Sequence, residues 1–128
     1  MVSILLDTNA VSAFFDKEPA VTSRIELMPE VFLPTIVVGE FAFGSLNSAD
    51  PEDNLAKLDD FIRGCEIVEC DLAVSREYAR IRYSLKRAGM PIPENDIWIA
   101  ACALTRDLPL LSKDEHFERV VGLTRIGW

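Results

Sequence analysis

Four carboxylates in this 128-residue chain stand beside apolar segments, where an ionised side chain is costly. Asp7 ends the apolar run ILL, and Asp114 lies two residues beyond the later run PLLS. Glu40 is the only charged residue in TIVVGEFAFG, and Asp96 directly precedes the apolar stretch IWIAACAL. If these acids converge, they repel one another, and a hard divalent cation such as Mg²⁺ or Mn²⁺ relieves that repulsion.

Each acid also has an ordinary structural explanation. Asp7 could cap a helix, and Asp96 could cap one or complement its dipole. Glu40 could extend from the flank of a half-buried helix, and Asp114 could stabilise a turn. These explanations weaken when the four positions are considered together, because all of them adjoin apolar sequence. The chain has a single histidine and three scattered cysteines, so a zinc site is not favoured.

A carboxylate cluster with Mg²⁺ or Mn²⁺ is suited to phosphodiester hydrolysis, because the metal activates water and neutralises charge on the phosphate. No Cys–His pair, Ser–His–Asp arrangement or glycine-rich phosphate loop competes with this interpretation. We interpret His116 as a local hydrogen-bonding residue rather than a ligand. The predicted metal ligands and catalytic residues are therefore the four acids.

The elements that position these acids follow from apolar periodicity, caps and turn signals. We expect strands at 2–6, 31–33, 66–69, 108–112 and 122–126, and helices at 9–15, from 19, 35–46, 51–63, 72–88 and 96–107. We expect Thr8 or Asn9 to cap the first helix. This alternation predicts a single α/β domain over residues 1–128, a three-layer α/β/α arrangement around a mainly parallel sheet. Strand ends meet at one edge of such a sheet, so Asp7 and Asp114 should lie together.

Composition narrows the protein class and the compartment. The hydrophobic fraction of 49% supports a real core, yet the longest apolar run, 97–104, is far below the ~20 residues of a membrane span. We see no signal peptide. Cys65, Cys70 and Cys102 form no CxxC pair, so we expect free thiols in a reducing cytoplasm and no membrane association.

A basic stripe interrupts the overall acidity of the chain. The net charge of −8 alone argues against nonspecific nucleic-acid binding. Arg76, Arg80, Tyr83 and Arg87, however, follow the i, i+4, i+7, i+11 spacing of one helix face. The stripe is either a solvated helix face or a ridge that contacts the phosphates of RNA, and the sequence leaves both open.

The ordered set LLDTN, a mid-chain helical glutamate, NDIWIAA and LLSKDEHF resembles the PIN domain over essentially the whole chain. Within that family it is most similar to VapC-like toxins of type II toxin–antitoxin systems. The resemblance implies a Mg²⁺- or Mn²⁺-dependent endoribonuclease with a three-layer α/β/α fold. It matches Asp7, Glu40, Asp96 and Asp114 to the family's four metal-binding acids.

The resemblance also assigns supporting residues. Ser112 occupies the position of a family hydroxyl residue that is more usually threonine. We expect Ser112, Thr8 and Asn9 to orient carboxylates or water rather than to bind metal. Glu115 adds a carboxylate to which we assign no role.

The same resemblance implies partners. We expect a homodimer, in part because FAFGSL carries aromatics that a small core does not fully cover. We also expect a small antitoxin whose C-terminal tail combines apolar anchors with a basic residue. The basic residue would pair with Asp7, Glu40 or Asp96. The anchors would occupy a groove lined by aromatic residues, namely Phe14, Phe15, Phe41 and Phe43.

Three rival functions stay open. A phosphatase with a nucleophilic aspartate also places an acid after its first strand, but it requires a second aspartate at the position where this chain has Asn9. A nuclease acting on structured DNA would use the same metal chemistry. A non-catalytic module could use the acidic cleft to dock a basic peptide. Metal-dependent cleavage of RNA would distinguish the predicted endoribonuclease from all three rivals.

Overall fold

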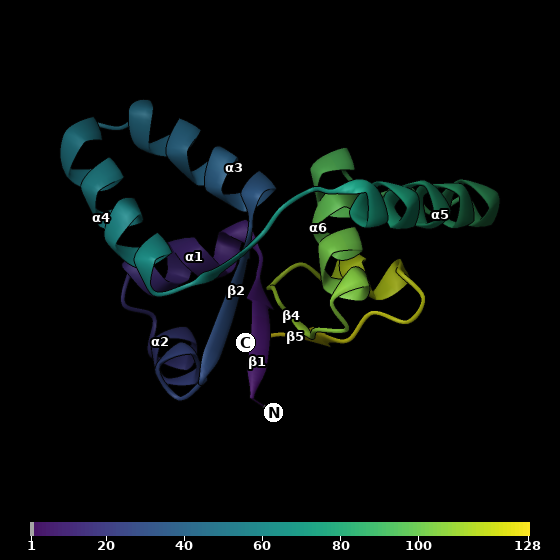
Figure 1. Ribbon diagram of the computed structural model, residues 1–128, viewed down its shortest axis with the longest axis horizontal. Coiled ribbons are helices and arrows are strands. Elements are labelled where there is room, and N and C mark those ends of the chain that lie inside the picture. Colours follow the sequence, from purple (N-terminus) through teal and green to yellow (C-terminus); the bar gives the residue numbers. More distant parts are fainter. Residues whose placement is uncertain (1) are drawn as a thin grey trace.

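The computed structural model describes residues 2–128, and its centre is a five-stranded sheet in which every pairing is parallel (Figure 1). The strand order is β3-β2-β1-β4-β5. The strands are β1 (Ser3–Leu6), β2 (Glu30–Pro34), β3 (Glu66–Val68), β4 (Leu110–Leu111) and β5 (Arg125–Ile126). The apolar run at the start of the chain forms the central strand, and Ile4, Leu5 and Leu6 are fully buried there.

Helices cover the sheet on both sides, which confirms the predicted α/β architecture. They are α1 (Thr8–Phe15), α2 (Pro19–Glu26), α3 (Thr35–Leu46), α4 (Pro51–Arg63), α5 (Leu72–Ala88) and α6 (Glu94–Thr105), followed by the 3₁₀ helix η1 (Glu115–Arg119). Figure 1 shows α1 to α4 on one side of the strands and α5 and α6 on the other. Right-handed crossovers produce this division, because the chain first moves from β1 outward to β3 and then returns to β4.

Local signals explain most helix boundaries. Asp50 caps α4 by accepting a hydrogen bond from the Asp53 N–H at 3.3 Å, and Pro51 takes the first helical position. Gly89 ends α5 with a φ of 68°, a left-handed conformation that favours glycine. Among the residues that the structure describes, no helix is long and apolar enough to cross a membrane.

Several boundaries differ from the sequence prediction. The cap of α1 is Asp7, as the structural explanation for that acid allowed, rather than Thr8 or Asn9. Helix α6 begins at Glu94, directly after Pro93, rather than at Asp96. The last two strands are shorter than the apolar runs that predicted them, because only 110–111 and 125–126 pair in the sheet.

The topology places a switch point at the carboxyl end of β1. The chain adds β2 and β3 on one side of β1 and then crosses from β3 to β4 on the other side, so β1 and β4 flank this switch point. Residues that directly follow β1 and β4 therefore lie where ligands usually bind in parallel sheets.

Candidate active site

Asp7 and Ser112 follow the two strands at this switch point. The Ser112 hydroxyl donates a 2.6 Å hydrogen bond to Asp7 Oδ2, and the Thr8 N–H donates to Asp7 Oδ1 at 2.7 Å. Both side chains are buried. Burial raises the pKa of Asp7 to about 6, the two hydrogen bonds oppose this rise, and the negative charges of Asp96 and Asp114 add to it.

Asn9 connects helix α1 to the segment that follows β4. Its Nδ2 donates to Asp114 Oδ2 at 3.1 Å, and its Oδ1 accepts from the Lys113 N–H at 3.2 Å. The Asp114 N–H in turn donates to Ser112 Oγ at 3.1 Å. These bonds fix Asp114 beside Asp7, at the edge of the sheet where the sequence prediction expected it.

Asp96 and His116 come together from α6 and η1. Their Oδ2 and Nε2 atoms lie 2.7 Å apart. Burial raises the pKa of Asp96, the bond to His116 opposes this, and the charges of Asp114 and Glu40 add to the rise. Asp96, Asp114 and His116 each offer a ligating atom, and these three atoms all lie within 4.8 Å of one another.

Glu40 approaches the same space from α3. Its Oε1 accepts a 2.9 Å hydrogen bond from the Thr8 hydroxyl, so Thr8 contacts Asp7 through its backbone and Glu40 through its side chain. The effect of Glu40 on the pKa of Asp96 indicates that the two carboxylates face a common region.

The sequence prediction and the geometry differ over which groups are closest. Within residues 2–128, the group with ligating atoms inside 4.8 Å contains Asp96, Asp114 and His116 but neither Asp7 nor Glu40. His116 does make the expected hydrogen bond, yet it also belongs to this group. The spacing Asp114-x-His116 in a turn after a strand is the signal that could have placed it there.

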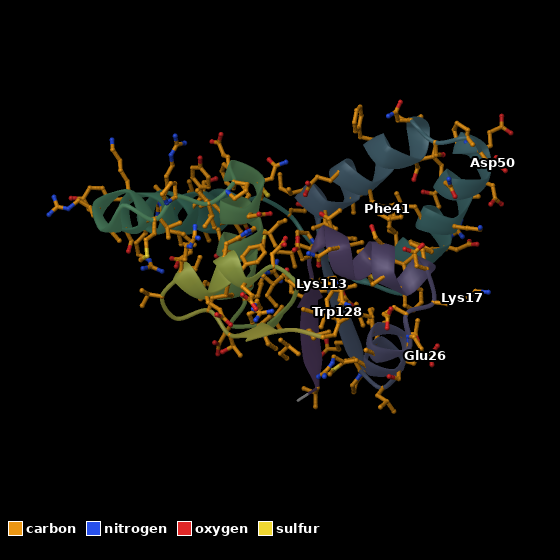
Figure 2. The ribbon with its side chains drawn as sticks, turned by 180° about the vertical axis from the view of Figure 1, so that it is seen from behind. Lys17, Glu26, Phe41, Asp50, Lys113 and Trp128 are labelled. Atoms are coloured by element: carbon orange, nitrogen blue, oxygen red, sulfur yellow. The ribbon has the colours of Figure 1, made fainter. Side chains whose placement is uncertain are left out.

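A large hollow with both apolar and polar lining residues lies beside helix α1. A hollow of about 1180 Å³ is lined by residues of α1, α2 and α4 and by Phe41 of α3 (Phe41, Lys17 and Glu26, all in its lining, are labelled in Figure 2). Its lining includes an aromatic cluster of Phe14, Phe15, Phe41 and Phe61. In the four ring pairs that are in contact, the ring centroids lie 4.9 to 5.7 Å apart. A second hollow of about 460 Å³ shares Phe15 and Phe41 and extends to Thr8 and Glu40.

Phe43 does not line either hollow, which corrects the predicted groove. It is 70% exposed on α3, and Phe61 of α4 contributes the fourth ring instead. Phe41 and Phe43 are two residues apart on one helix, so their side chains point to different faces.

The basic stripe lies on the exposed side of α5. Arg76, Arg80 and Arg87 are exposed; Arg80 pairs with Glu77, and the Arg87 guanidinium lies 5.9 Å from the Tyr83 ring centroid. Figure 1 shows α5 extending outward from the strands. This geometry fits both the solvated and the phosphate-contacting interpretation.

Fold and site together define a class of protein: a parallel α/β domain that gathers carboxylates at the topological switch point of its sheet. The family model of the PIN domain matches residues 4–123. The chain is 32% identical to "Ribonuclease VapC2" of Haemophilus influenzae, covering 100% of this chain and 99% of that protein. It is 30% identical to "tRNA(fMet)-specific endonuclease VapC" of Shigella flexneri, with the same coverage.

The backbone agrees with these sequence matches. The DNA-bound VapBC structure from Salmonella typhimurium superposes with a TM-score of 0.92 at 29% identity, covering 100% of this chain and 99% of that chain. The chain therefore belongs to the PIN-domain family and, within it, to the VapC ribonucleases.

Proposed function

We propose that this chain is the toxin of a toxin–antitoxin pair and hydrolyses RNA phosphodiester bonds with Mg²⁺ or Mn²⁺. The observation that supports this most is the meeting of Asp96, Asp114 and His116 within 4.8 Å. Asp7 adds a buried carboxyl at the same edge, and its raised pKa reflects burial among other negative charges. Such a group of oxygen donors is more stable with a divalent cation than without one.

The donor set fits a hard cation. Asp7, Asp96 and Asp114 would supply carboxylate oxygens, with Glu40 at the edge of the site, and His116 would supply one nitrogen or orient Asp96. A bound cation would polarise the scissile phosphate and lower the pKa of an attacking water.

Several uncharged side chains fix the geometry of the acids. Ser112 donates to one oxygen of Asp7, and the other oxygen accepts from the Thr8 N–H and retains a lone pair that a cation could use. Asn9 holds Asp114, and the Thr8 hydroxyl holds Glu40. These contacts place the carboxylates before substrate arrives, which lowers the reorganisation that catalysis requires.

We assign the RNA contacts outside the acidic site to Arg76, Arg80 and Arg87. A cluster of carboxylates repels the phosphates that flank the scissile bond, so attraction must come from another surface. These three arginines are exposed on one helix face, and Tyr83 among them, 64% exposed, offers a ring on which a base can stack. The name of the Shigella flexneri relative specifies an initiator tRNA, which makes a folded RNA a reasonable first substrate.

The hollows beside the site support an antitoxin partner. The hollow with the aromatic cluster and the hollow that reaches Glu40 share the lining residues Phe15, Asp16, Phe41 and Asn54, so the two adjoin. An amphipathic tail could anchor apolar side chains on the phenylalanines and extend a lysine or arginine toward Glu40. The Salmonella typhimurium relative is itself part of a VapBC complex.

We further propose a homodimer formed through the exposed side of α3. Phe43 and Leu46 are 70% and 61% exposed, and Gly39 is exposed one turn earlier. Positions 39, 43 and 46 follow one helix face, so they form an apolar stripe without a cover in the monomer.

RNA cleavage by the purified chain tests the proposed function. We expect cleavage of tRNA with Mn²⁺ or Mg²⁺, none in EDTA, and recovery when metal is restored in excess. Asp96→Asn should lose at least about 100-fold in activity because it removes a ligand. Asp59→Asn, an equal charge change on exposed α4, is the matched control and should stay active. Cleavage that persists in EDTA or in Asp96→Asn would refute the proposal.

A further inference from the structure

Arg125, in the edge strand β5, extends its guanidinium to the backbone of Ser112, a residue of the candidate site. Its side chain is 15% exposed. One amino group, Nη1, donates to the Ser112 carbonyl at 3.0 Å, and the other, Nη2, donates to Glu118 Oε1 at 2.9 Å. Its Nε is buried without a partner, and an unsatisfied buried donor costs free energy. Packing alone therefore does not explain an arginine at this position.

The first contact connects Arg125 to the acids through a single residue. Ser112 donates its N–H to the Ile126 carbonyl at 3.0 Å, its carbonyl accepts from Arg125, and its hydroxyl donates to Asp7. Ser112 Oγ also accepts from the Asp114 N–H. Every polar group of Ser112 is thus used, and β5 holds both backbone groups.

The second contact fixes the far end of the same segment. Glu118 lies in η1, two residues after His116, whose ring touches Asp96. Arg125 therefore spans residues 112–118, the segment that carries Asp114 and His116. A lysine carries its donors on a single nitrogen, so it cannot reproduce the two separate nitrogens with which arginine reaches Ser112 and Glu118.

Because Gly127 has no side chain, the Arg125 guanidinium can occupy the space beside it. A Cβ added at this position would lie 2.6 Å from Arg125 Nη1 and 3.4 Å from its Cζ. An alanine there forces the end of the Arg125 side chain to move, and with it the bond to Ser112. Both residues lie beyond position 123, where the match to the PIN-domain model ends.

We propose that Arg125, with the space provided by Gly127, is a positioning residue that sets the separation between Asp7 and the Asp114–His116 segment. The link to catalysis rests on the proposed function, whereas the positioning itself is a property of the metal-free chain. The arginine touches no reacting group and acts through Ser112 and Glu118.

The test compares Arg125→Met, Arg125→Lys and Gly127→Ala with Arg63→Met, which removes an equal charge from the exposed end of α4. In metal-free protein, amide hydrogen exchange at Lys113 and Asp114 should accelerate at least about 10-fold in the first three variants. The Ile99 amide, within α6, should keep its rate. Manganese affinity, measured by the electron paramagnetic resonance of free Mn²⁺, should fall about 10-fold, the lower end for residues that orient ligands.

Gly127→Ala decides the case if Arg125→Met fails to fold, because it keeps the arginine and its charge. Unchanged exchange at 113 and 114 in Gly127→Ala would overturn the proposal, as would a uniform acceleration that includes Ile99. If wild-type protein neither binds Mn²⁺ nor cleaves RNA, the proposed function fails. The exchange data still decide the role of Arg125.

Discussion

The Ser112 hydroxyl donates a 2.6 Å hydrogen bond to Asp7 Oδ2, although 105 residues separate the two in sequence. The parallel pairing of β1 with β4 brings them together, and both side chains are buried. This bond stabilises the ionised form of an acid whose pKa burial has raised to about 6. The pairing of β1 with β4 therefore affects the protonation of Asp7 directly through this hydrogen bond.

Removing the Ser112 hydroxyl should reduce catalysis while the protein stays folded. Ser112→Ala deletes the donor to Asp7 and the acceptor for the Asp114 N–H, so we predict a further rise in the pKa of Asp7 and an about 10-fold loss of kcat. Ser112→Thr retains the hydroxyl and should keep most activity. Carbon-13 NMR titration of the aspartates and steady-state kinetics measure the two effects. Equal activity of the alanine and threonine variants would contradict this role.

The pH dependence of stability follows from the raised pKa of Asp7. The folded state holds its proton up to about pH 6, whereas the unfolded chain releases it near 3.8, so the folded state binds more protons between these values. Stability of the metal-free protein should therefore fall as pH rises from about 4 to 6, by at most about 3 kcal/mol from this group.

Asp7→Asn should remove that loss and raise the melting temperature at pH 7.5 in EDTA, with a smaller effect at pH 4. Thermal melts followed by circular dichroism measure it, and the matched control is again Asp59→Asn. A lower melting temperature for Asp7→Asn at pH 7.5 would mean that the carboxylate mainly serves the fold.

Replacing Arg76, Arg80 and Arg87 together by alanine should weaken RNA binding and reduce its salt dependence. Each lost phosphate contact on a single strand reduces the slope of log K against log salt by about 0.7. The matched control removes three exposed positive charges elsewhere, at Lys57, Arg63 and Arg106. An unchanged slope in the α5 variant, measured by fluorescence anisotropy with inactive Asp96→Asn protein, would leave the stripe as a solvated face.

Phe41 and Phe43 allow the antitoxin and dimer surfaces to be separated. Phe41→Ala should weaken binding of the antitoxin encoded beside this chain at least about 10-fold, because Phe41 lines both hollows. Phe43→Ser should spare that binding and shift the protein toward monomer, because the ring is exposed on α3. Calorimetry with the antitoxin tail and light scattering provide the two readouts. If instead Phe43→Ser weakened antitoxin binding and Phe41→Ala shifted the protein toward monomer, the two surfaces would have the opposite roles.

The sequence predicted those features that depend on local chemistry. Apolar runs bounded by turn residues located the strands, and helix α5 has the predicted bounds 72–88 because Gly89 is a strong stop signal. Because β1 and β4 pair in parallel, Asp7 and Asp114 meet at one edge, as the sequence prediction required.

Features that depend on tertiary register were missed. The spacing Asp114-x-His116 marks His116 as a candidate, but whether it reaches Asp96 depends on how η1 packs against α6, and the local sequence does not fix that distance. The role of Arg125 depends on the pairing of β5 with β4 and on the missing Cβ at position 127. Phe43 stands near Phe41 in the sequence, but the helical period turns its ring to another face of α3, away from the groove.

A crystal soaked in Mn²⁺ and measured at the manganese absorption edge tests the central claim most directly. We predict an anomalous peak in contact with carboxylate oxygens of Asp96 and Asp114, close to His116, which disappears in Asp96→Asn. A chain that cleaves RNA in Mn²⁺ but shows no such peak, or shows it only away from these residues, would contradict the account.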